Sequence, residues 1–517
     1  MTRHRCGWRL LACVALVLLH EDVWAHGSAD STHATQRSES SAVSNAPAPT
    51  DTGPSADIGP TADIEPSADE PVAATEELIA GRGFQKFQYK GVSFSPGGFF
   101  DATAVIRSAN ENADVQSTFG NIPLQGSDNS HLQEFRGTAR GSRLNLLGEG
   151  HYRKTAISGY VEIDFLGSST SGNELETNSW NARLRQLWST IELSNGTSFL
   201  IGQGWSLLTT HRIGLKARNE FIPLSTDLQG VVGYNWARQW QLRVTKALGP
   251  TLQMAVAIEN PETSVSGVIQ PTGVQGFNTS PNAQSPSNFF TTSTTSGANG
   301  VSTDLAPDII GKLVWEPGYG HWELKGLMRF FRDRLNSHNH VAVGGGVGLA
   351  AVLPLTSTVN LIAEGLVGQG IGRYASTIGA DLVASPSGKI VPIAAFHFMG
   401  GLEWHPTKEW DVYAYYGIEQ YARTSYAGTP IGYGSSLADL SGCAVENPGT
   451  LPCQAANATI TQVQPGLWYR VITSDVGSVA LGLSYSYTHR SVWSDSQGVQ
   501  PWGENHMIMT TIRYYLP

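Results

Sequence analysis

Four consecutive segments decide the fold of this chain: EFRGTARGSRLNLLGEG (134–150), ISGYVEIDFLG (157–167), NSWNARLRQLWSTIEL (178–193) and TSFLIGQGWSLL (197–208). Each alternates apolar and polar side chains, and polar or glycine-bearing breaks separate them, a pattern typical of β-strands joined by turns. Successive strand side chains point to opposite sides. The second segment therefore has an apolar face (Ile157, Val161, Ile163, Phe165) and a polar face (Ser158, Tyr160, Glu162, Asp164).

Two of these segments depart from strict alternation. In 178–193, Leu184 and Trp188 are predicted on the apolar face with Ala182, and Gln186 interrupts that face. In 134–150, Arg136 and Arg140 share one parity while Arg143 has the other. A β-bulge near Gly141 would restore the phase, because glycine tolerates the bulge conformation.

Composition excludes a helical membrane protein. The chain has 517 residues, 57 of them glycine, and 40% are hydrophobic. The longest apolar run, Leu10–Leu19, is too short for a spanning helix, which needs about 18 or more residues. It follows three arginines and precedes the small-residue site Val23-Trp24-Ala25. This predicts a signal peptide over 1–25 and export, with a lipoprotein signal ending at Cys13 as the alternative.

Residues 26–83 have the composition of a disordered acidic spacer. They are rich in Pro, Ala, Ser and Asp, and a hexad recurs at Pro54, Pro60 and Pro66. They hold ten acidic and two basic side chains, so most of the net charge of −10 belongs to this stretch. The remainder is nearly neutral, which gives nucleic-acid binding no support.

The remaining residues, 84–517, are predicted to form an all-β transmembrane antiparallel barrel of about sixteen strands. Short connections alternate with long polar ones, as expected for short periplasmic turns and long external loops. Aromatic residues near strand ends or on lipid-side parity suit interfacial girdles; they include Trp188, Trp205, Trp236, Trp240, Trp322, Trp404, Trp410, Tyr485 and Tyr514. The alternative is the aromatic core of a soluble β protein.

Two cysteines, Cys443 and Cys453, remain after the predicted signal peptide. They lie in a polar stretch with Pro and Gly, and an oxidising compartment favours a loop disulfide between them. A metal pair is the less favoured interpretation, since no His or Cys cluster stands beside them.

Seven motifs, in order, resemble the DcaP-like porins. They are GGFFDATAVIR (97–107), EFRGTARGSRL (134–144), GYVEIDFLG (159–167), ARLRQLWSTIEL (182–193), GQGWSLL (202–208), VGYNWARQWQLRV (232–244) and AVAIENP (255–261). The resemblance covers about a third of the chain. It implies a 16-stranded, homotrimeric channel of the bacterial outer membrane, in contact with lipid and lipopolysaccharide, inserted by the barrel assembly machinery and passing small, often anionic solutes.

If the apolar faces contact lipid, the opposite faces line the lumen. The predicted pore-lining residues are Arg136, Arg140, Arg143, Glu162, Asp164, Arg183, Arg185 and Arg243. Arginine keeps its charge and its planar fork suits carboxylates or phosphates, so the row would concentrate anions. Alternatively, these arginines mainly pair with Glu162 and Asp164 and stiffen the wall.

The connection 209–230 follows the fifth strand, where porins of this type fold a loop into the barrel. It would supply constriction charges from Arg212, Lys216, Arg218, Glu220 and Asp227, with the stretch Phe221–Leu224 packed on the wall. An ordinary external loop is the alternative.

No motif indicates catalysis, a cofactor or a metal site. The sequence has no GxSxG, HExxH or paired CxxC, and His338 and His340 are expected to be solvated in an external loop. The favoured function is a passive channel for small hydrophilic, anionic solutes. The alternatives are a channel specific for a carboxylate or sugar, a secreted carbohydrate-binding β protein, and a barrel enzyme.

Overall fold

A computed structural model describes residues 86–167, 181–277 and 302–517. Contacts divide the chain into two units, Met1–Ala68 and Asp69–Pro517, and all described residues belong to the second. The predicted signal peptide (1–25) and acidic spacer (26–83) lie outside the described residues.

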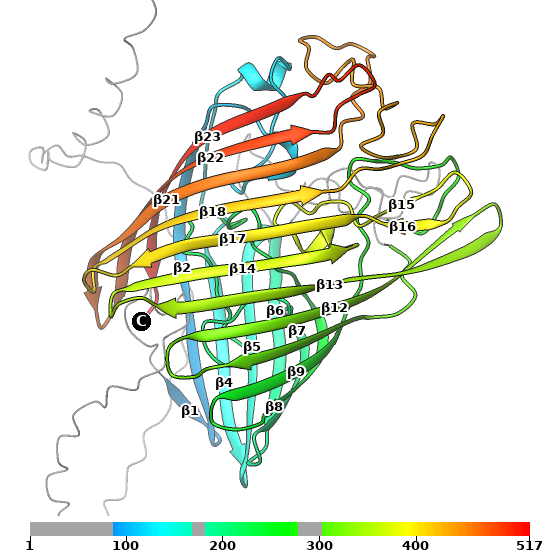
Figure 1. The fold of residues 1–517 in the computed structure, drawn as a ribbon. Helices are drawn as coiled ribbons and strands as arrows, with labels where there is room; N and C mark the ends of the chain where they lie inside the picture. Colours follow the sequence, from blue (N-terminus) through cyan, green and yellow to red (C-terminus); the bar gives the residue numbers. More distant parts are fainter. Residues whose placement is uncertain (1–85, 168–180, 278–301) are drawn as a thin grey trace, which may run out of the picture. The chain divides into compact units, whose positions relative to one another are not determined.

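The described residues form a closed antiparallel β-barrel (Figure 1). The main sheet contains 18 strands and closes where β2 pairs with β23. β1 (Phe87–Tyr89) pairs only with β2, and β3 and β4 both pair with β2 as two parts of one broken strand. Sixteen strand positions therefore surround the barrel, as the sequence predicts.

In order around the barrel the strands are β2 (Val92–Arg107), β3 (Glu134–Thr138) with β4 (Arg143–Tyr152), β5 (Thr155–Gly167), β6 (Asn181–Glu192), β7 (Thr197–Trp205), β8 (Arg238–Ala247), β9 (Leu252–Glu259), β11 (Asp308–Trp315), β12 (His321–Leu335), β13 (His338–Pro354), β14 (Val359–Gln369), β17 (Ala394–Trp404), β18 (Trp410–Tyr421), β21 (Asn457–Ser474), β22 (Gly477–Val492) and β23 (Trp502–Tyr515).

The connections give the barrel two different ends. One end, which we call the short-turn end, has the turns β4–β5, β6–β7, β8–β9, β11–β12, β13–β14, β17–β18 and β21–β22. The other, the loop end, has the long connections, with β10 (Val268–Ile269), β15 (Leu382–Ala384), β16 (Ile390–Pro392), β19 (Thr424–Ser425), β20 (Gly432–Tyr433) and the 3-10 turns Phe119–Asn121, Asp128–His131 and Gly372–Tyr374.

The β12–β13 hairpin is the exception at the loop end. Only Asn336 and Ser337 join its two strands, and both adopt positive φ, 52° and 65°. The hairpin extends beyond its neighbours (Figure 1). His338 and His340 consequently lie on β13 rather than in a loop, and His340 Nδ1 is 2.8 Å from Asp333 Oδ1.

A β-bulge resolves the interrupted alternation of β6. Glu162 pairs with Gln186 and Ile163 pairs with Leu184, so Arg185 is the extra residue. Both Arg185 and Gln186 are consequently buried inside the barrel. The phase shift also turns Trp188 inward, where its ring packs at a tilt against that of Tyr160, with the ring centres 5.2 Å apart. The prediction of Trp188 on the lipid face is therefore wrong.

The break between β3 and β4 spans residues 139–142, where the bulge near Gly141 is expected. Both strands nevertheless keep their pairing with β2, through Thr103–Thr138 and Phe99–Arg143. The break lets Arg136 and Arg143, which have opposite parity in the sequence, belong to the same face of the sheet.

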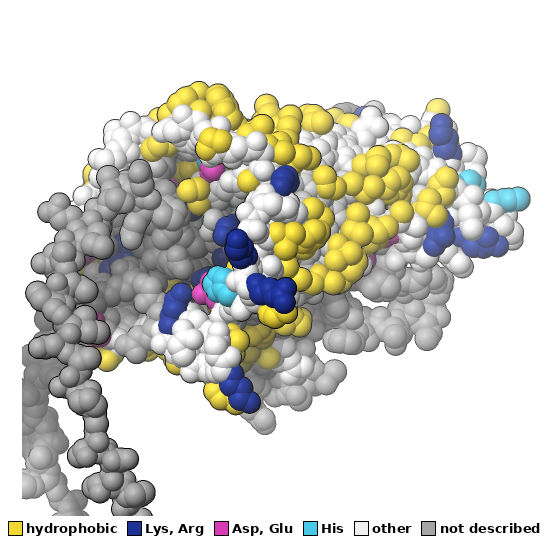
Figure 2. Space-filling model, turned by 90° about the horizontal axis from the view of Figure 1, so that it is seen from below, with side chains coloured by type: hydrophobic (Ala, Val, Ile, Leu, Met, Phe, Trp, Pro, Cys, Tyr) yellow, Lys and Arg dark blue, Asp and Glu magenta, His cyan; other side chains and the backbone are white. Residues whose placement is uncertain are grey.

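Large apolar side chains cover the outside of the barrel. Leu187, Ile201, Val347, Leu349 and Ile512 are each more than half exposed, and similar residues occur on nearly every strand. Hydrophobic side chains spread over the visible wall in Figure 2. Trp240, Trp404, Trp410 and Tyr485 are exposed as predicted, whereas Trp205 and Trp236 are half-buried and their ring centres lie 5.8 Å apart. None of the helices in the described ranges is long and apolar enough to cross a bilayer.

Candidate functional site: the barrel interior

Four predicted pore-lining residues form one ion-pair cluster on β5 and β6. Asp164 accepts two hydrogen bonds from Arg183, from Nε at 3.0 Å and from Nη2 at 2.7 Å. Arg185 donates from Nε to Glu162 Oε1 at 2.6 Å and from Nη1 to Asp164 Oδ2 at 2.8 Å. Arg185 keeps the inward side that its parity with Arg183 predicts, and the bulge adds Gln186 to the same side beside Glu162.

Arg136 and Arg140 belong to a second cluster near the loop end. Arg136 Nε lies 3.0 Å from Glu134 Oε2, and Glu134 also binds Arg107 at 3.0 Å. Arg140 pairs with Asp114, from the β2–β3 connection. The Arg140–Asp114 pair joins the wall to that connection, and the Arg136–Glu134 pair lies within the wall, so both arginines act at least partly as structural residues.

Three further arginines have other neighbours. Arg143 lies over the ring of Phe99 at 5.0 Å and interacts electrostatically with Arg185, Glu162 and Asp164. Arg243 donates to the Trp205 carbonyl at 2.7 Å and to Gln241 at 2.9 Å. Arg238, which sequence reasoning missed, lies 5.0 Å from the ring centre of Trp205 and 5.3 Å from that of Trp236.

Within the described part of the chain, Arg238 and Arg243 form no ion pair with a carboxylate, and each keeps one buried Nη1 without a hydrogen-bond partner. The signal for Arg238 was its place between two tryptophans, Trp236 and Trp240, at the start of a strand. β8 begins at Arg238 itself.

The chain between β7 and β8, residues 206–237, runs into the barrel, and we call it the inner segment. Leu207 N donates to Glu259 at the loop end of β9, at 2.7 Å. Gly214 N donates to Glu316 in the β11–β12 turn, also at 2.7 Å. The inner segment therefore descends from the loop end to the short-turn end within eight residues.

The inner segment then returns along the opposite wall. The backbone amides of Leu224, Val232 and Gly233 donate to Tyr415, Gln462 and Glu419 at 2.9, 3.0 and 2.9 Å. Asn235 N donates to Glu364 on β14 at 2.7 Å. These acceptors are inward side chains of strands, so the wall supplies the hydrogen bonds that an irregular segment inside a barrel needs.

Close packing and polar pairing both hold the inner segment. A side chain at Gly417 of β18 would overlap the carbonyl oxygen of Val232, so only glycine allows this approach. Phe221 and Leu224 are fully buried among Tyr413, Tyr415 and Trp468.

Arg212 forms the strongest link between the inner segment and the wall. Its Nη1 and Nη2 lie 2.8 and 2.9 Å from the two carboxylate oxygens of Glu403 on β17. Burial alone would lower the pKa of Arg212, but the charge and hydrogen bonds of Glu403 outweigh it and raise the pKa. Both side chains are almost fully buried, and the planar fork of arginine suits this bidentate geometry.

The other predicted constriction residues have different surroundings. Glu220 and Asp227 are buried, and burial raises the pKa of each carboxyl. Lys216 is exposed and pairs with Glu192 at 2.8 Å, at the short-turn end. Arg218 lies over the ring of Tyr160 at 5.3 Å. Of the five residues, only Lys216 and Arg218 therefore keep accessible side chains.

Sequence reasoning also missed a buried cluster on β11 and β12. Lys312 Nζ is 2.9 Å from Glu323 Oε2, and Lys325 is 3.3 Å from the same oxygen. Glu323 also accepts a hydrogen bond from His211 N at 2.8 Å. Burial, and then the charge of Lys312, lower the pKa of His211 to about 3. The available signal was the inward parity of Glu323 and Lys325 beside Trp322 and Leu324.

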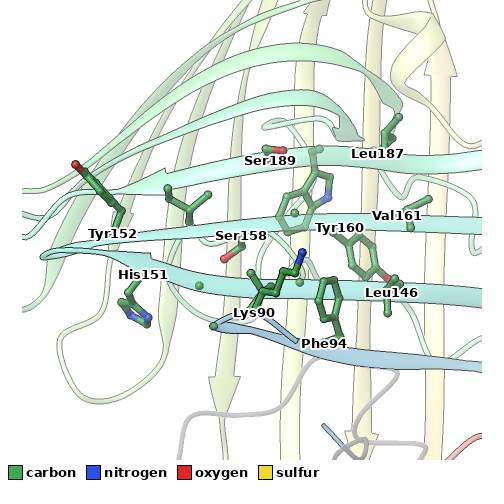
Figure 3. Close-up of a pocket in the computed structure, with 17 residues that line it drawn as sticks. Lys90, Phe94, Leu146, His151, Tyr152, Ser158, Tyr160, Val161, Leu187 and Ser189 are labelled. Atoms are coloured by element: carbon green, nitrogen blue, oxygen red, sulfur yellow. The ribbon is translucent and has the colours of Figure 1, made fainter. Parts of the chain in front are cut away.

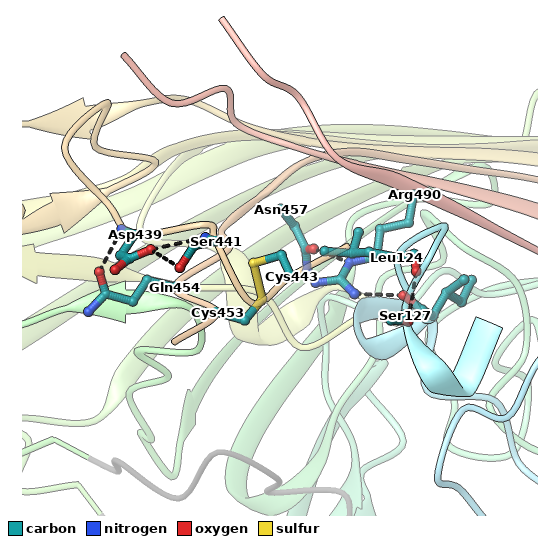
Figure 4. Close-up of a disulfide and its surroundings, with 10 residues drawn as sticks. Leu124, Ser127, Asp439, Ser441, Cys443, Cys453, Gln454, Asn457 and Arg490 are labelled. Atoms are coloured by element: carbon teal, nitrogen blue, oxygen red, sulfur yellow. Dashed lines mark hydrogen bonds between the residues drawn. A yellow bond between two sulfur atoms is a disulfide. The ribbon is translucent and has the colours of Figure 1, made fainter. Parts of the chain in front are cut away.

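A disulfide joins Cys443 and Cys453 in the β18–β21 connection (Figure 4). Cys443 packs with Leu124 and Val492, and Arg490 donates to Asn457 and to the Ile122 carbonyl, each at 2.6 Å. The disulfide therefore belongs to a contact between two connections at the loop end. Among the described residues, no group of His, Cys, Asp and Glu is arranged to hold a metal ion.

Comparisons with known proteins give a match for the fold. No protein-family model and no curated protein matches the chain. The structure of the outer membrane channel DcaP of Acinetobacter baumannii has a TM-score of 0.58 and 17% identity, and the match covers 83% of this chain and 99% of that one.

Two other solved structures are more distant. The anion-selective porin from Comamonas acidovorans has a TM-score of 0.43 and 10% identity over 82% of this chain and 100% of its own. OmpF of Salmonella typhi, in complex with daunomycin, has a TM-score of 0.46 and 9% identity, and the match covers 84% of this chain and 100% of that one. The resemblance to DcaP-like porins predicted from the motifs is confirmed at the level of the fold: this chain is a closed antiparallel barrel with the architecture of the DcaP outer membrane channel.

Proposed function

We propose that this protein is a porin of the bacterial outer membrane, through which small hydrophilic solutes diffuse passively. The observation that carries the proposal is the distribution of side chains across the wall. Leucine, valine, isoleucine and aromatic side chains are exposed outside, while charged side chains face inward from most strands. A closed barrel leaves no unpaired edge, so it satisfies its backbone in lipid.

Anions are the proposed solutes. Arg183 and Arg185 are neutralised by Glu162 and Asp164, but Arg238 and Arg243 have no carboxylate bonded to them within the described part of the chain. Each arginine keeps one buried Nη1 without a hydrogen-bond partner, and a low-dielectric wall strengthens the attraction between such charges and an anion. In this proposal Arg183 and Arg185, which pair with Glu162 and Asp164, mainly stabilise the wall, while Arg238 and Arg243 attract anions.

A channel specific for a carboxylate is the second candidate, and the inner segment favours it. This segment crosses the whole height of the interior and is held on both walls. A structure that occupies the interior in this way reduces the space for a general pore. A carboxylate has two oxygens that can accept hydrogen bonds from the unpartnered Nη1 of Arg238 and of Arg243.

The remaining parts of the proposal concern the cell. The protein is exported through its predicted signal peptide, inserted by the barrel assembly machinery, and surrounded by outer-membrane lipid and lipopolysaccharide as a homotrimer. Its role is transport rather than catalysis, and the proposal requires no cofactor.

Planar-bilayer recording of the refolded barrel tests the function. Under a KCl gradient we expect discrete conductance steps and a reversal potential that favours chloride. Conductance steps with a reversal potential that favours potassium would support the channel but contradict the anion preference, and would assign ion selectivity to the inward carboxylates. A correctly folded barrel without conductance would contradict the channel proposal.

A further inference from the structure

An apolar groove of about 650 Å³ lies on the outer face of the barrel, close to the short-turn end (Figure 3). It crosses β2, β4, β5 and β6. Its apolar lining comes from Val92, Phe94, Leu146, Ile157, Val161 and Leu187.

The strand register explains why the surface is hollow at this place. Phe94 pairs with Gly148, Gly148 with Gly159, and Gly159 with Ser189, so one row across the sheet has small side chains in its middle. The next row, towards the loop end, carries Leu146, Val161 and Leu187. The groove thus lies over a row of small residues, Gly148, Gly159 and Ser189, and larger apolar side chains border it.

Positive charges border the groove at the short-turn end. Lys90, in the β1–β2 turn, is one of the lining residues and lies over the groove in Figure 3. Arg153 and Lys154 form the β4–β5 turn, and all three side chains are exposed. Across residues 86–167, 181–277 and 302–517, none of the three forms an ion pair. None of the other short turns of the barrel carries a net positive charge.

We propose that this groove binds an anionic glycerophospholipid from the membrane leaflet at the short-turn end. One acyl chain occupies the groove, and the headgroup phosphate contacts Lys90, Arg153 and Lys154. The proposal rests on the proposed membrane location of the barrel. It adds a defined lipid site to an otherwise unspecific lipid-facing surface.

The combination of charge and shape selects this occupant. The acidic residues 26–83 of the chain complement the charge, but they contain few large apolar side chains that could fill the groove. A second copy of the chain could cover the apolar surface, but the exposed cations would then require acidic partners. An anionic lipid supplies both the apolar chain and the negative charge.

The site can be tested by native mass spectrometry of the full chain in detergent, with added phosphatidylglycerol or phosphatidylcholine. We expect the wild type to retain phosphatidylglycerol preferentially. The triple variant Lys90→Asn, Arg153→Asn, Lys154→Gln should bind it roughly a hundredfold more weakly, about fivefold for each charge. Asparagine is chosen at Lys90 and Arg153 because both have positive φ, which it tolerates.

A second variant fills the groove. A Cβ at Gly159 would meet only Ser189 Oγ, at 3.9 Å, so the leucine of Gly159→Leu can extend into the groove; this variant should fold normally and abolish retention of the lipid. Gly311→Leu is the matched control, because a Cβ there has no neighbour within 4 Å and points to the same outer face, on β11. Heat-modifiable migration reports whether each barrel is folded.

Two outcomes would overturn the site: equal retention of both lipids, or retention that neither groove variant changes. Loss of an oligomer in Gly159→Leu, without any change in lipid retention, would assign the groove to a contact between copies instead. Conductance of the same preparations separates the two proposals. A conducting barrel without lipid preference refutes only the lipid site, and a lipid-binding barrel without conductance refutes only the channel.

Discussion

Arg185 determines the charge of the best-defined cluster in the interior. Its guanidinium bonds both Glu162 and Asp164, and all three side chains are buried. Removing one partner from a buried ion pair leaves an uncompensated charge, which costs more than the pair itself contributes. Selectivity and stability are therefore coupled at this residue.

The double variant Arg183→Gln, Arg185→Gln should remove the two guanidinium groups that bond Glu162 and Asp164. We expect a loss of about 3 kcal/mol or more in the free energy of unfolding and a reversal potential shifted towards potassium. Urea unfolding in detergent and bilayer recording measure the two effects. The fourfold variant that also carries Glu162→Gln and Asp164→Asn should recover much of both. Unchanged selectivity in the double variant would contradict a role for these arginines in anion preference.

His211 gives the inner segment a defined pH dependence. Its pKa is about 3 in the folded protein, against 6.5 for an ordinary histidine. Between these pH values the unfolded chain binds a proton at His211 that the folded protein does not bind. The free energy of unfolding therefore decreases as pH falls from about 6.5 to about 3.

The variant His211→Gln should lack that part of the pH dependence. Unfolding midpoints measured from pH 3 to pH 7 test this expectation. His131→Gln is the control, since its side chain is 53% exposed. The assignment fails if the profile of His211→Gln matches that of the wild type.

At the scale of elements, the inner segment is the part that decides what the barrel can pass. It is anchored by one bidentate ion pair to β17 and by single hydrogen bonds to several other strands. Because Arg212 lies on the descending limb, its loss frees that limb near the short-turn end.

Arg212→Ala should increase single-channel conductance and its noise, because Glu403 loses its partner and the descending limb is released. Lys216→Ala is the matched control on the same limb. The Lys216 side chain, which pairs with Glu192, is 69% exposed, and exposed ion pairs contribute about 0–1 kcal/mol to the free energy of unfolding. Equal conductance in wild type and Arg212→Ala would show that the limb is held without this ion pair.

The disulfide acts on another element, the β18–β21 connection. In the double variant Cys443→Ser, Cys453→Ser, the connection loses a cross-link that closes a short loop, a stabilisation of about 3 kcal/mol in the chain-entropy view. We expect faster proteolysis within residues 422–456 and unchanged barrel migration on gels. Unaltered proteolysis would show that packing against Leu124 and Val492 is sufficient.

For the whole molecule, the exposed apolar wall makes a nonpolar solvent necessary. We expect the protein to require detergent, to migrate differently before and after heating, and to appear as a trimer after mild cross-linking in detergent. A protein that stays monodisperse in buffer without detergent would contradict the membrane location. A single monomer band after cross-linking would contradict the trimer alone.

The sequence determined the architecture because the side-chain period of a strand is local. Alternation, the sixteen strand positions and the order of short and long connections follow from neighbouring residues, and the structure agrees with them. The inward parity of Glu162, Asp164 and Arg183 follows in the same way, since no long-range contact is needed to fix it.

Only the tertiary structure decided where this local period is interrupted and what lies inside. The bulge at Arg185 reverses the sides of all later residues of β6, including Trp188, and depends on pairing with β5. The pairing of Arg212 with Glu403 joins residues 191 positions apart. The groove needs glycines on two different strands to fall in register. Such contacts depend on closure of the barrel, which brings distant segments together, and no local pattern encodes them.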